Sequence, residues 1–156
     1  MTLSPSRCLI LACGNTLRGD DGVGLWLAEW AEQRFSGQPG VRILADHQWT
    51  PELAEDVAHA HSVLFIDCSL ATPAGAINFT PVEPAEAGRK QSTHHLDAAQ
   101  LLALARDLYG SLPRSAQQLT IGAGETGLGE RLSPEVTAAL PEACRLIKET
   151  VSHLLG

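Results

Sequence analysis

Apolar runs separated by short polar turns divide this chain into alternating predicted strands and helices. Residues 8–13 and 62–66 are almost continuously apolar, which is typical of parallel strands covered on both faces. Residues 41–46 alternate in part between apolar and polar, and this pattern predicts a strand nearer the edge of the sheet. Two further strands are expected at residues 76–81 and 117–123, the first of them near an edge.

One helix is predicted by apolar residues that recur at the spacing of helical turns. Between residues 22 and 35 these positions form one stripe, and both tryptophans in it are expected in the core: Val23, Trp26, Leu27, Trp30 and Ala31. Three more helices begin at residues that commonly cap a helix. They are expected at about residues 50–59, 92–108 and 133–155, with Thr50, Ser92 or Thr93, and Ser133 as the caps. Pro141 is expected to kink or split the last of them.

The alternation of strands and helices predicts the fold class. Mostly short connections indicate an α/β protein, a three-layer α/β/α sandwich around a mostly parallel sheet of about five strands, with right-handed crossovers. The chain has 156 residues, of which 44% are hydrophobic, and no linker-like stretch. Residues 1–156 are therefore expected to form a single domain whose core needs no disulfide or structural metal.

Composition and charge argue against several classes of partner. The formal net charge of −7 disfavours nucleic acid and anionic membranes. No stretch approaches a membrane span of about 20 apolar residues, and the N-terminal apolar run is too short for a signal peptide. The four cysteines form no C-x-x-C motif, so we expect free thiols without a chemical role in a reducing cytoplasm. A monomer is expected because no surplus apolar helix face is evident.

Candidate chemistry begins in the glycine-rich loop between the first strand and the first helix. The loop is Gly14-Asn15-Thr16-Leu17-Arg18-Gly19-Asp20-Asp21-Gly22-Val23-Gly24, and its glycines indicate positive φ angles or a close approach of backbone. Such loops commonly hold phosphate, but two adjacent carboxylates would repel an anion, and no Gly-Lys-Ser/Thr ending or intact G-x-G-x-x-G is present. We therefore predict a cation site. The alternative is that Asp20 or Asp21 only caps the helix.

A third carboxylate and two histidines are expected near the same edge of the sheet. Asp67 ends the most apolar strand, and the carboxyl ends of parallel strands form the crevice where such sheets bind ligands. His94 and His95 fall in the predicted first turn of the next helix, where one imidazole could point into the crevice. The alternatives are a turn aspartate and surface histidines. His47 and Trp49 follow another strand and either line the cleft or lie in a solvated loop.

Two carboxylates and one imidazole make a site for a borderline divalent metal such as Zn²⁺ or Ni²⁺, with a position left for water or substrate. An open position favours recognition or hydrolysis over a purely structural role. A metal could polarise a carbonyl or lower the pKa of a water, or one of Asp20, Asp21 and Asp67 could act as a general base. The chain shows no convincing Ser-His-Asp or Cys-His arrangement and no H-E-x-x-H motif.

The acidic glycine motif at residues 14–24 resembles that of the hydrogenase maturation proteases, which cut a C-terminal extension from the nickel-loaded large subunit of [NiFe]-hydrogenase. Phe65-Ile66-Asp67, Ser92-Thr93-His94 and, more weakly, residues 129–136 follow in the order and at the distances of that family. The resemblance covers nearly the whole chain and implies the same sandwich fold.

The family resemblance also implies a function and a site. It implies an aspartyl-type endopeptidase of the cytoplasm whose partner is the hydrogenase large-subunit precursor. Asp21, Asp67 and His94 would be the metal-binding and catalytic triad, with Asp20 as a possible fourth catalytic residue. The nickel belongs to the substrate, and zinc or another divalent metal is an option for the free protein.

Two stretches depart from the family pattern. Ala12-Cys13-Gly14-Asn15 stands where the family usually has Gly-x-Gly-Asn, a change that a tight turn can accommodate. Residues 47–53 replace a glycine-rich segment that many members carry after the second strand. Because that segment borders the cleft, the resemblance does not identify which hydrogenase is processed.

Two other functions stay open on the sequence. Phosphoacceptor receiver domains, which are signalling modules, also place an acidic pair after the first strand and an aspartate after the third, as Asp20, Asp21 and Asp67 do here. Receivers need a lysine after the last strand, where this chain has Gly122-Ala123-Gly124, and a small phosphodonor would phosphorylate them. A nickel-binding chaperone would have the same ligands as the protease and no hydrolytic activity.

Overall fold

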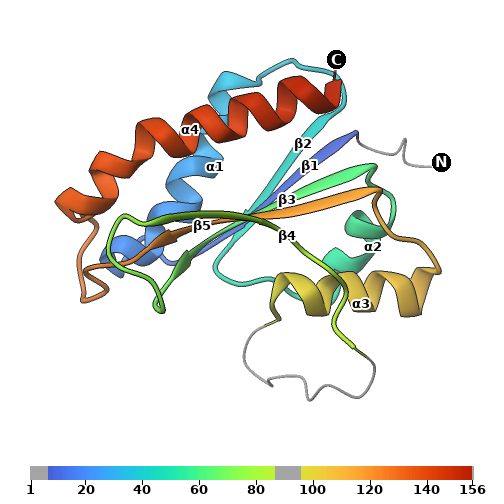
Figure 1. Ribbon diagram of the computed structural model, residues 1–156, viewed down its shortest axis with the longest axis horizontal. Coiled ribbons are helices and arrows are strands. Elements are labelled where there is room, and N and C mark those ends of the chain that lie inside the picture. Colours follow the sequence, from blue (N-terminus) through green and yellow to red (C-terminus); the bar gives the residue numbers. More distant parts are fainter. Residues whose placement is uncertain (1–6, 87–95, 156) are drawn as a thin grey trace.

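The computed structural model describes residues 7–86 and 96–155 of the chain. Strands and helices alternate along most of this length (Figure 1). In chain order the elements are β1 (Cys8–Cys13), the short 3-10 helix η1 (Gly19–Gly22), α1 (Val23–Arg34), β2 (Val41–Asp46), α2 (Leu53–Ala58), β3 (Ser62–Ser69), β4 (Ile77–Pro81), α3 (Ala98–Tyr109), β5 (Ser115–Gly122) and α4 (Pro134–Leu155).

The five strands form one sheet in the order β2-β1-β3-β5-β4. β1 pairs in parallel with β2 and β3, β3 pairs in parallel with β5, and β4 runs antiparallel to β5. The expected mostly parallel sheet of five strands is confirmed, with β2 and β4 at its edges. Ala12 pairs with Ile66, so the residues that follow them, Cys13 and Asp67, lie at the same level of the sheet.

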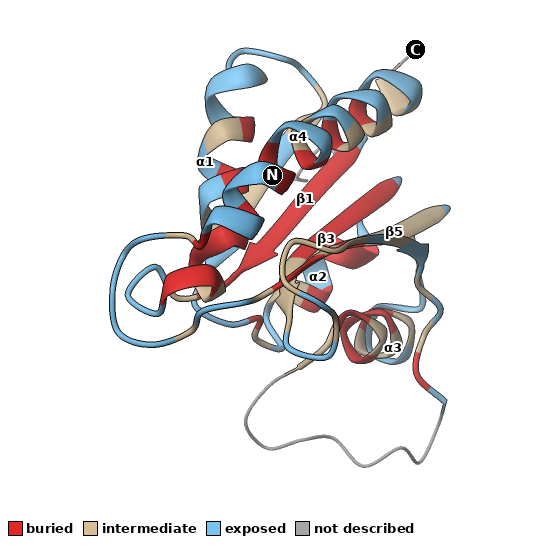
Figure 2. Cartoon of the chain, turned by 60° about the vertical axis from the view of Figure 1, so that its left-hand side comes forward, coloured by how far each residue is buried: buried red, intermediate tan, exposed pale blue. Residues whose placement is uncertain are grey.

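Two helices cover each face of the sheet, which makes the three-layer α/β/α sandwich expected from the sequence. α1 and α4 lie on one face, and α2 and α3 lie on the other (Figures 1 and 2). Each face has its own apolar core: Ile10 and Ile147 belong to the first, and Leu11 and Leu101 belong to the second. The interior strand β1 is buried along its whole length (Figure 2), as its continuous apolarity requires.

Helix α3 begins later than the sequence predicts. Asp97 is its N-cap: the Asp97 side chain accepts a hydrogen bond from the Gln100 N–H at 2.8 Å, and the Gln100 side chain accepts one from the Asp97 N–H at 2.9 Å. Because this reciprocal pair fixes the start of α3 at Ala98, the prediction that this helix begins at Ser92 or Thr93 is wrong. His94 and His95 lie outside the described residues.

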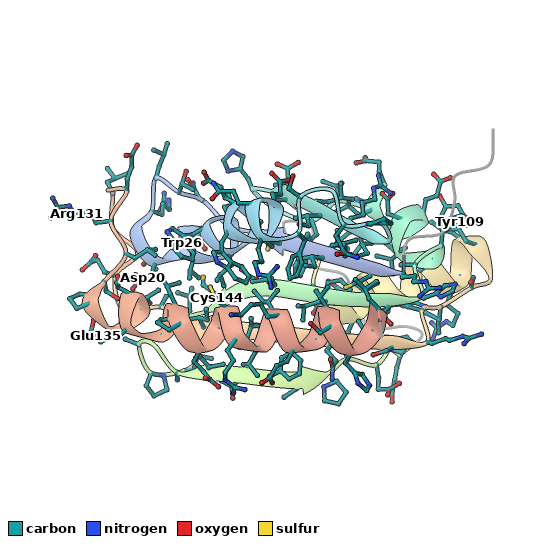
Figure 3. All side chains as sticks on the ribbon, turned by 90° about the horizontal axis from the view of Figure 1, so that it is seen from above. Asp20, Trp26, Tyr109, Arg131, Glu135 and Cys144 are labelled. Carbon is teal, nitrogen blue, oxygen red and sulfur yellow. The ribbon has the colours of Figure 1, made fainter. Side chains whose placement is uncertain are left out.

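Smaller corrections concern α1 and α2. Trp26 is 41% exposed, so it is not the core residue that its spacing predicts, whereas Val23 and Leu27 are buried (Trp26 is labelled in Figure 3). α2 begins at Leu53 rather than at Pro51, because residues 50–52 form a turn before the helix.

The C-terminal helix α4 begins as expected. The Val136 N–H donates to Ser133 Oγ at 3.3 Å, which confirms Ser133 as the cap. Pro141 lies inside the helix, which continues through it as one element of 22 residues rather than splitting. Among the described helices, none combines the length and apolarity needed to cross a membrane.

Candidate functional site

The glycine-rich loop after β1 folds back and orients Asp21. A Cβ on Gly14 would lie 2.1 Å from the Asp21 carbonyl oxygen, so this close approach requires glycine. The Asn15 N–H donates to Asp21 Oδ2 at 3.0 Å, and Asn15 Oδ1 accepts from the Leu17 N–H at 2.9 Å. The glycine and the asparagine of the motif thus fix the direction of the Asp21 carboxylate.

Asp20 connects the acidic loop to the segment that precedes α4. Its side chain is fully buried. It accepts hydrogen bonds from the N–H groups of Gly124 and Glu125, both at 2.7 Å, and from the Ser133 N–H at 2.6 Å. Figure 3 shows Asp20 at the end of the molecule where Arg131 also lies. These bonds join segments that are more than a hundred residues apart in the chain.

The environment of Asp20 favours its charged form. Burial alone raises the pKa of Asp20, but the hydrogen bonds from Ser133, Glu125 and Gly124 outweigh it and hold the pKa below its ordinary value. Neither η1 nor α1 receives a hydrogen bond from a capping side chain. The alternative that Asp20 or Asp21 caps the helix is therefore wrong, and both oxygens of Asp20 are used in holding the loop.

Asp21 and Asp67 converge where β1 and β3 approach their carboxyl ends. With Cys68 they form a group in which one donor atom from each residue lies within 4.8 Å of the others. The Cys68 thiol donates to Asp21 Oδ1 at 3.1 Å, and the Cys68 N–H donates to Asp67 Oδ1 at 2.7 Å. Asp67 lies inside β3 and pairs with Thr120, so the strand runs further than the sequence predicts. The convergence itself follows from the parallel topology.

Two thiols lie beside the carboxylates, although the sequence predicts no chemical role for the cysteines. The Cys68 thiol forms a hydrogen bond with Asp21, and the Cys13 thiol forms one with Asp67. Burial raises the pKa of both thiols, and these hydrogen bonds and nearby negative charges raise it further. Both are protonated at neutral pH in the free protein, which disfavours a cysteine nucleophile. The sequence signal was their position: Cys13 ends β1, and Cys68 follows Asp67 directly.

A cavity of about 300 Å³ opens beside this group. It is lined by Cys13, Asp21, His47, Gln48, Trp49, Asp67, Cys68, Leu70 and Leu96. The prediction that His47 and Trp49 line a cleft is therefore confirmed. Trp49 is only 4% exposed, and its ring packs edge-to-face on Phe65 with the ring centres 5.3 Å apart. Within the described part of the chain, its indole N–H is buried and has no hydrogen-bond partner.

A second cavity of similar size, about 290 Å³, lies near the start of β5. Its lining is rich in proline, with Glu83 and Arg114 as the charged residues. One acidic and one basic side chain give no converging set of metal ligands, so the cavity beside Asp21 and Asp67 is the candidate site.

The donor atoms in this cavity suit a divalent metal of intermediate hardness. Two carboxylates supply oxygen, which many divalent cations accept, and the Cys68 sulfur favours borderline metals such as zinc over magnesium or calcium. His94, the third member of the triad implied by the family resemblance, lies outside the described residues. The triad of Asp21, Asp67 and His94 therefore stays a prediction.

Solved structures of hydrogenase maturation proteases share this fold. The hydrogenase maturating endopeptidase HybD from E. coli is similar over 94% of this chain and 93% of its own, with a TM-score of 0.78 and 22% identity. The [NiFe] hydrogenase maturation protease HycI from Thermococcus kodakarensis KOD1 is 25% identical, with a TM-score of 0.68 over 92% of this chain and 91% of its own.

A second protein from Thermococcus kodakarensis, the [NiFe] hydrogenase maturation protease HybD, is 26% identical, with a TM-score of 0.68 over 92% of this chain and 98% of its own. No protein-family model matches the chain, and no curated protein does. The structural likenesses confirm the family resemblance that the acidic loop first indicated.

Proposed function

We infer that this chain belongs to the hydrogenase maturation proteases and is a peptidase. Its sandwich fold is that of three such proteins over more than nine-tenths of the chain. The acidic motif, Asp67 and the helix after residue 97 follow in the order expected of that family. Its substrate would be the large-subunit precursor of a [NiFe]-hydrogenase, from which it removes the C-terminal extension once nickel is in place.

One observation carries the metal-recognition part of this proposal: Asp21 from η1 and Asp67 from β3 reach the same cavity. Two carboxylates in one site attract a divalent cation and repel anionic ligands. Nickel seated in the precursor is such a cation, so these two side chains would bind it as part of the substrate. His94 is proposed as the third ligand on the strength of the family resemblance.

The shape of the cavity supports a peptide-borne metal as its occupant. Its volume of about 300 Å³ lies at the small end of ligand sites. Leu70, which is 78% exposed, and Leu96 add apolar surface to the lining. A metal centre with a short length of peptide fits such a site, whereas a folded domain stays outside it.

Cleavage of purified precursor tests this function. The chain is mixed with large-subunit precursor from the same organism, with and without inserted nickel, and the mobility shift on a gel reports removal of the extension. We expect cleavage of the nickel-loaded precursor alone. Asp21→Asn and Asp67→Asn should lower the rate by at least about 100-fold, because each removes a charged metal contact.

Asp107→Asn is the matched control, because Asp107 is an exposed carboxylate on α3 that forms an ion pair with its neighbour Arg106. It should cleave at the unmodified rate. Full activity in Asp21→Asn and Asp67→Asn would refute the assigned roles. Nickel-dependent binding without cleavage would instead identify a nickel-binding chaperone.

The receiver-domain alternative is not supported by the sheet. Flavodoxin-like folds, which include receivers, have the strand order 2-1-3-4-5. Here β5 lies beside β3, and β4 is an antiparallel edge strand. β5 also ends at Gly122 without a lysine, so the chemistry that a receiver needs is missing at that place.

A further inference from the structure

Cys68 places a sulfur atom next to the two carboxylates of the site. Its Sγ lies 3.1 Å from Asp21 Oδ1, and it belongs to the group of donor atoms that lie within 4.8 Å of one another. Cys68 is also one of the residues that line the cavity. A metal in this site therefore has a sulfur donor within reach as well as oxygen donors.

The spacing of the three donors fits one ion. Bond lengths of about 2.3 Å to sulfur and about 2.0 Å to oxygen give edges of roughly 3.5 Å between ligand atoms in a tetrahedral zinc site. The separations here run from 3.1 Å for Cys68 and Asp21 up to 4.8 Å at most. Side-chain shifts of little more than 1 Å bring all three to that edge length.

A polar group without a partner among the described residues also lies in the wall of the same cavity. Trp49 is 4% exposed, and its indole N–H has no partner among the described residues. Buried donors are nearly always hydrogen-bonded in native proteins. Trp49 lines the cavity that holds Asp21, Asp67 and Cys68, so this unpartnered donor lies in the wall of the site.

We propose that Cys68 is a direct metal ligand and that, with Asp21 and Asp67, it makes a sulfur- and oxygen-donor site for a borderline divalent transition metal such as Co²⁺, Ni²⁺ or Zn²⁺. On binding, the thiol loses its proton to solvent, and the metal–sulfur bond replaces the hydrogen bond to Asp21. The thiolate and two carboxylates carry three negative charges, which the divalent ion offsets in part. This inference rests on the metal recognition in the proposed function and adds a soft ligand to it.

Cys13 provides the internal control for this assignment. Its thiol hydrogen-bonds to Asp67, and Cys13 also lines the cavity, but it is not among the donors that converge within 4.8 Å. We therefore assign it a positioning role toward Asp67. Replacing Cys68 should remove the sulfur ligand, whereas replacing Cys13 should leave it in place.

Titration of the free protein with Co²⁺ alone tests the proposal without any cleavage assay. The unmodified chain should show a saturable near-ultraviolet band from thiolate-to-cobalt charge transfer, and should release a proton from its thiol as the metal binds. Cys68→Ser and Cys68→Ala should lose the band and bind Co²⁺ at least about 10-fold more weakly. Cys13→Ser should keep the band.

The proposal is overturned if the unmodified chain binds no Co²⁺, or binds it without the sulfur band. It is also overturned if the band survives in both Cys68 variants or disappears in Cys13→Ser alone. The unmodified chain decides the first two outcomes even if a variant folds poorly. Because cleavage of the nickel-loaded precursor is measured separately, the proposed function can hold while this inference fails, and the reverse.

Discussion

The two adjacent aspartates of the loop have different roles. Asp20 points into the protein, where three backbone N–H groups surround its carboxylate. Asp21 points toward the cavity, where it meets Cys68 and comes close to Asp67. A pair of identical residues in the sequence is therefore one structural carboxylate and one candidate ligand.

Replacing Asp20 by Asn should destabilise the fold in a pH-dependent way. The amide cannot satisfy all three N–H groups, so at pH 7 we expect a loss of about 2–3 kcal/mol in the free energy of unfolding, measured by urea denaturation. The pKa of Asp20 is lower in the folded chain than its ordinary value. Its stabilisation is therefore complete above the unfolded pKa of about 3.9 and fades as the pH falls through the folded pKa.

The difference between the unmodified chain and Asp20→Asn should thus be constant at neutral pH and should shrink in acid. Asp107→Asn, an exposed carboxylate, gives the baseline and should stay within about 0.5 kcal/mol of the unmodified chain. A difference for Asp20→Asn that grows in acid would contradict the assigned hydrogen bonds.

Among the elements, α1 is packed unusually close to the strand ends that carry the site. A Cβ on Gly24, in the first turn of the helix, would lie 2.3 Å from the Cys13 carbonyl oxygen and 3.3 Å from that of Ile66. Both contacts are with backbone, so no side-chain rotation can relieve them. This glycine allows the helix to approach β1 and β3 where Cys13 and Asp67 lie.

Gly24→Ala should therefore destabilise the fold, although alanine is the better helix former by about 1 kcal/mol. We expect overpacking to win, with a net loss of about 2 kcal/mol or more in thermal or urea unfolding. Gly127→Ala is the matched control, because its Cβ would meet only the end of the Glu125 side chain, which can rotate away. A stabilised Gly24→Ala protein would show that the helix is not held this closely.

The sequence predicts some helices and strands better than others. The continuous apolarity of β1 leaves no competing assignment, and its bounds match. The start of α3 was missed because Ser92, Thr93 and Asp97 can all cap a helix, and only the reciprocal bonds with Gln100 decide among them. The antiparallel direction of β4 has no local signal, since it depends on pairing with a strand that comes much later in the chain.

For the molecule as a whole, the site is a product of topology. Asp21 and Asp67 could be placed together from the sequence because parallel strands end at one edge of the sheet. The structural role of Asp20 could not be predicted from the sequence, because its hydrogen-bond partners are more than a hundred residues away in the chain. The sequence does not predict a role for the two thiols for a related reason: the spacing of Cys13 and Cys68 fits no known motif, and only the neighbouring carboxylates give them a role.

Recognition of the substrate's nickel is measured as the affinity of the chain for nickel-loaded and nickel-free precursor, compared between the unmodified protein and Asp67→Asn. If Asp21 and Asp67 bind the nickel of the substrate, the unmodified chain should prefer the loaded precursor by at least about 10-fold, or about 1.4 kcal/mol. Asp67→Asn should bind both forms alike. Equal binding of both forms by the unmodified chain, or an unchanged preference in Asp67→Asn, would show that these carboxylates do not bind the nickel of the substrate.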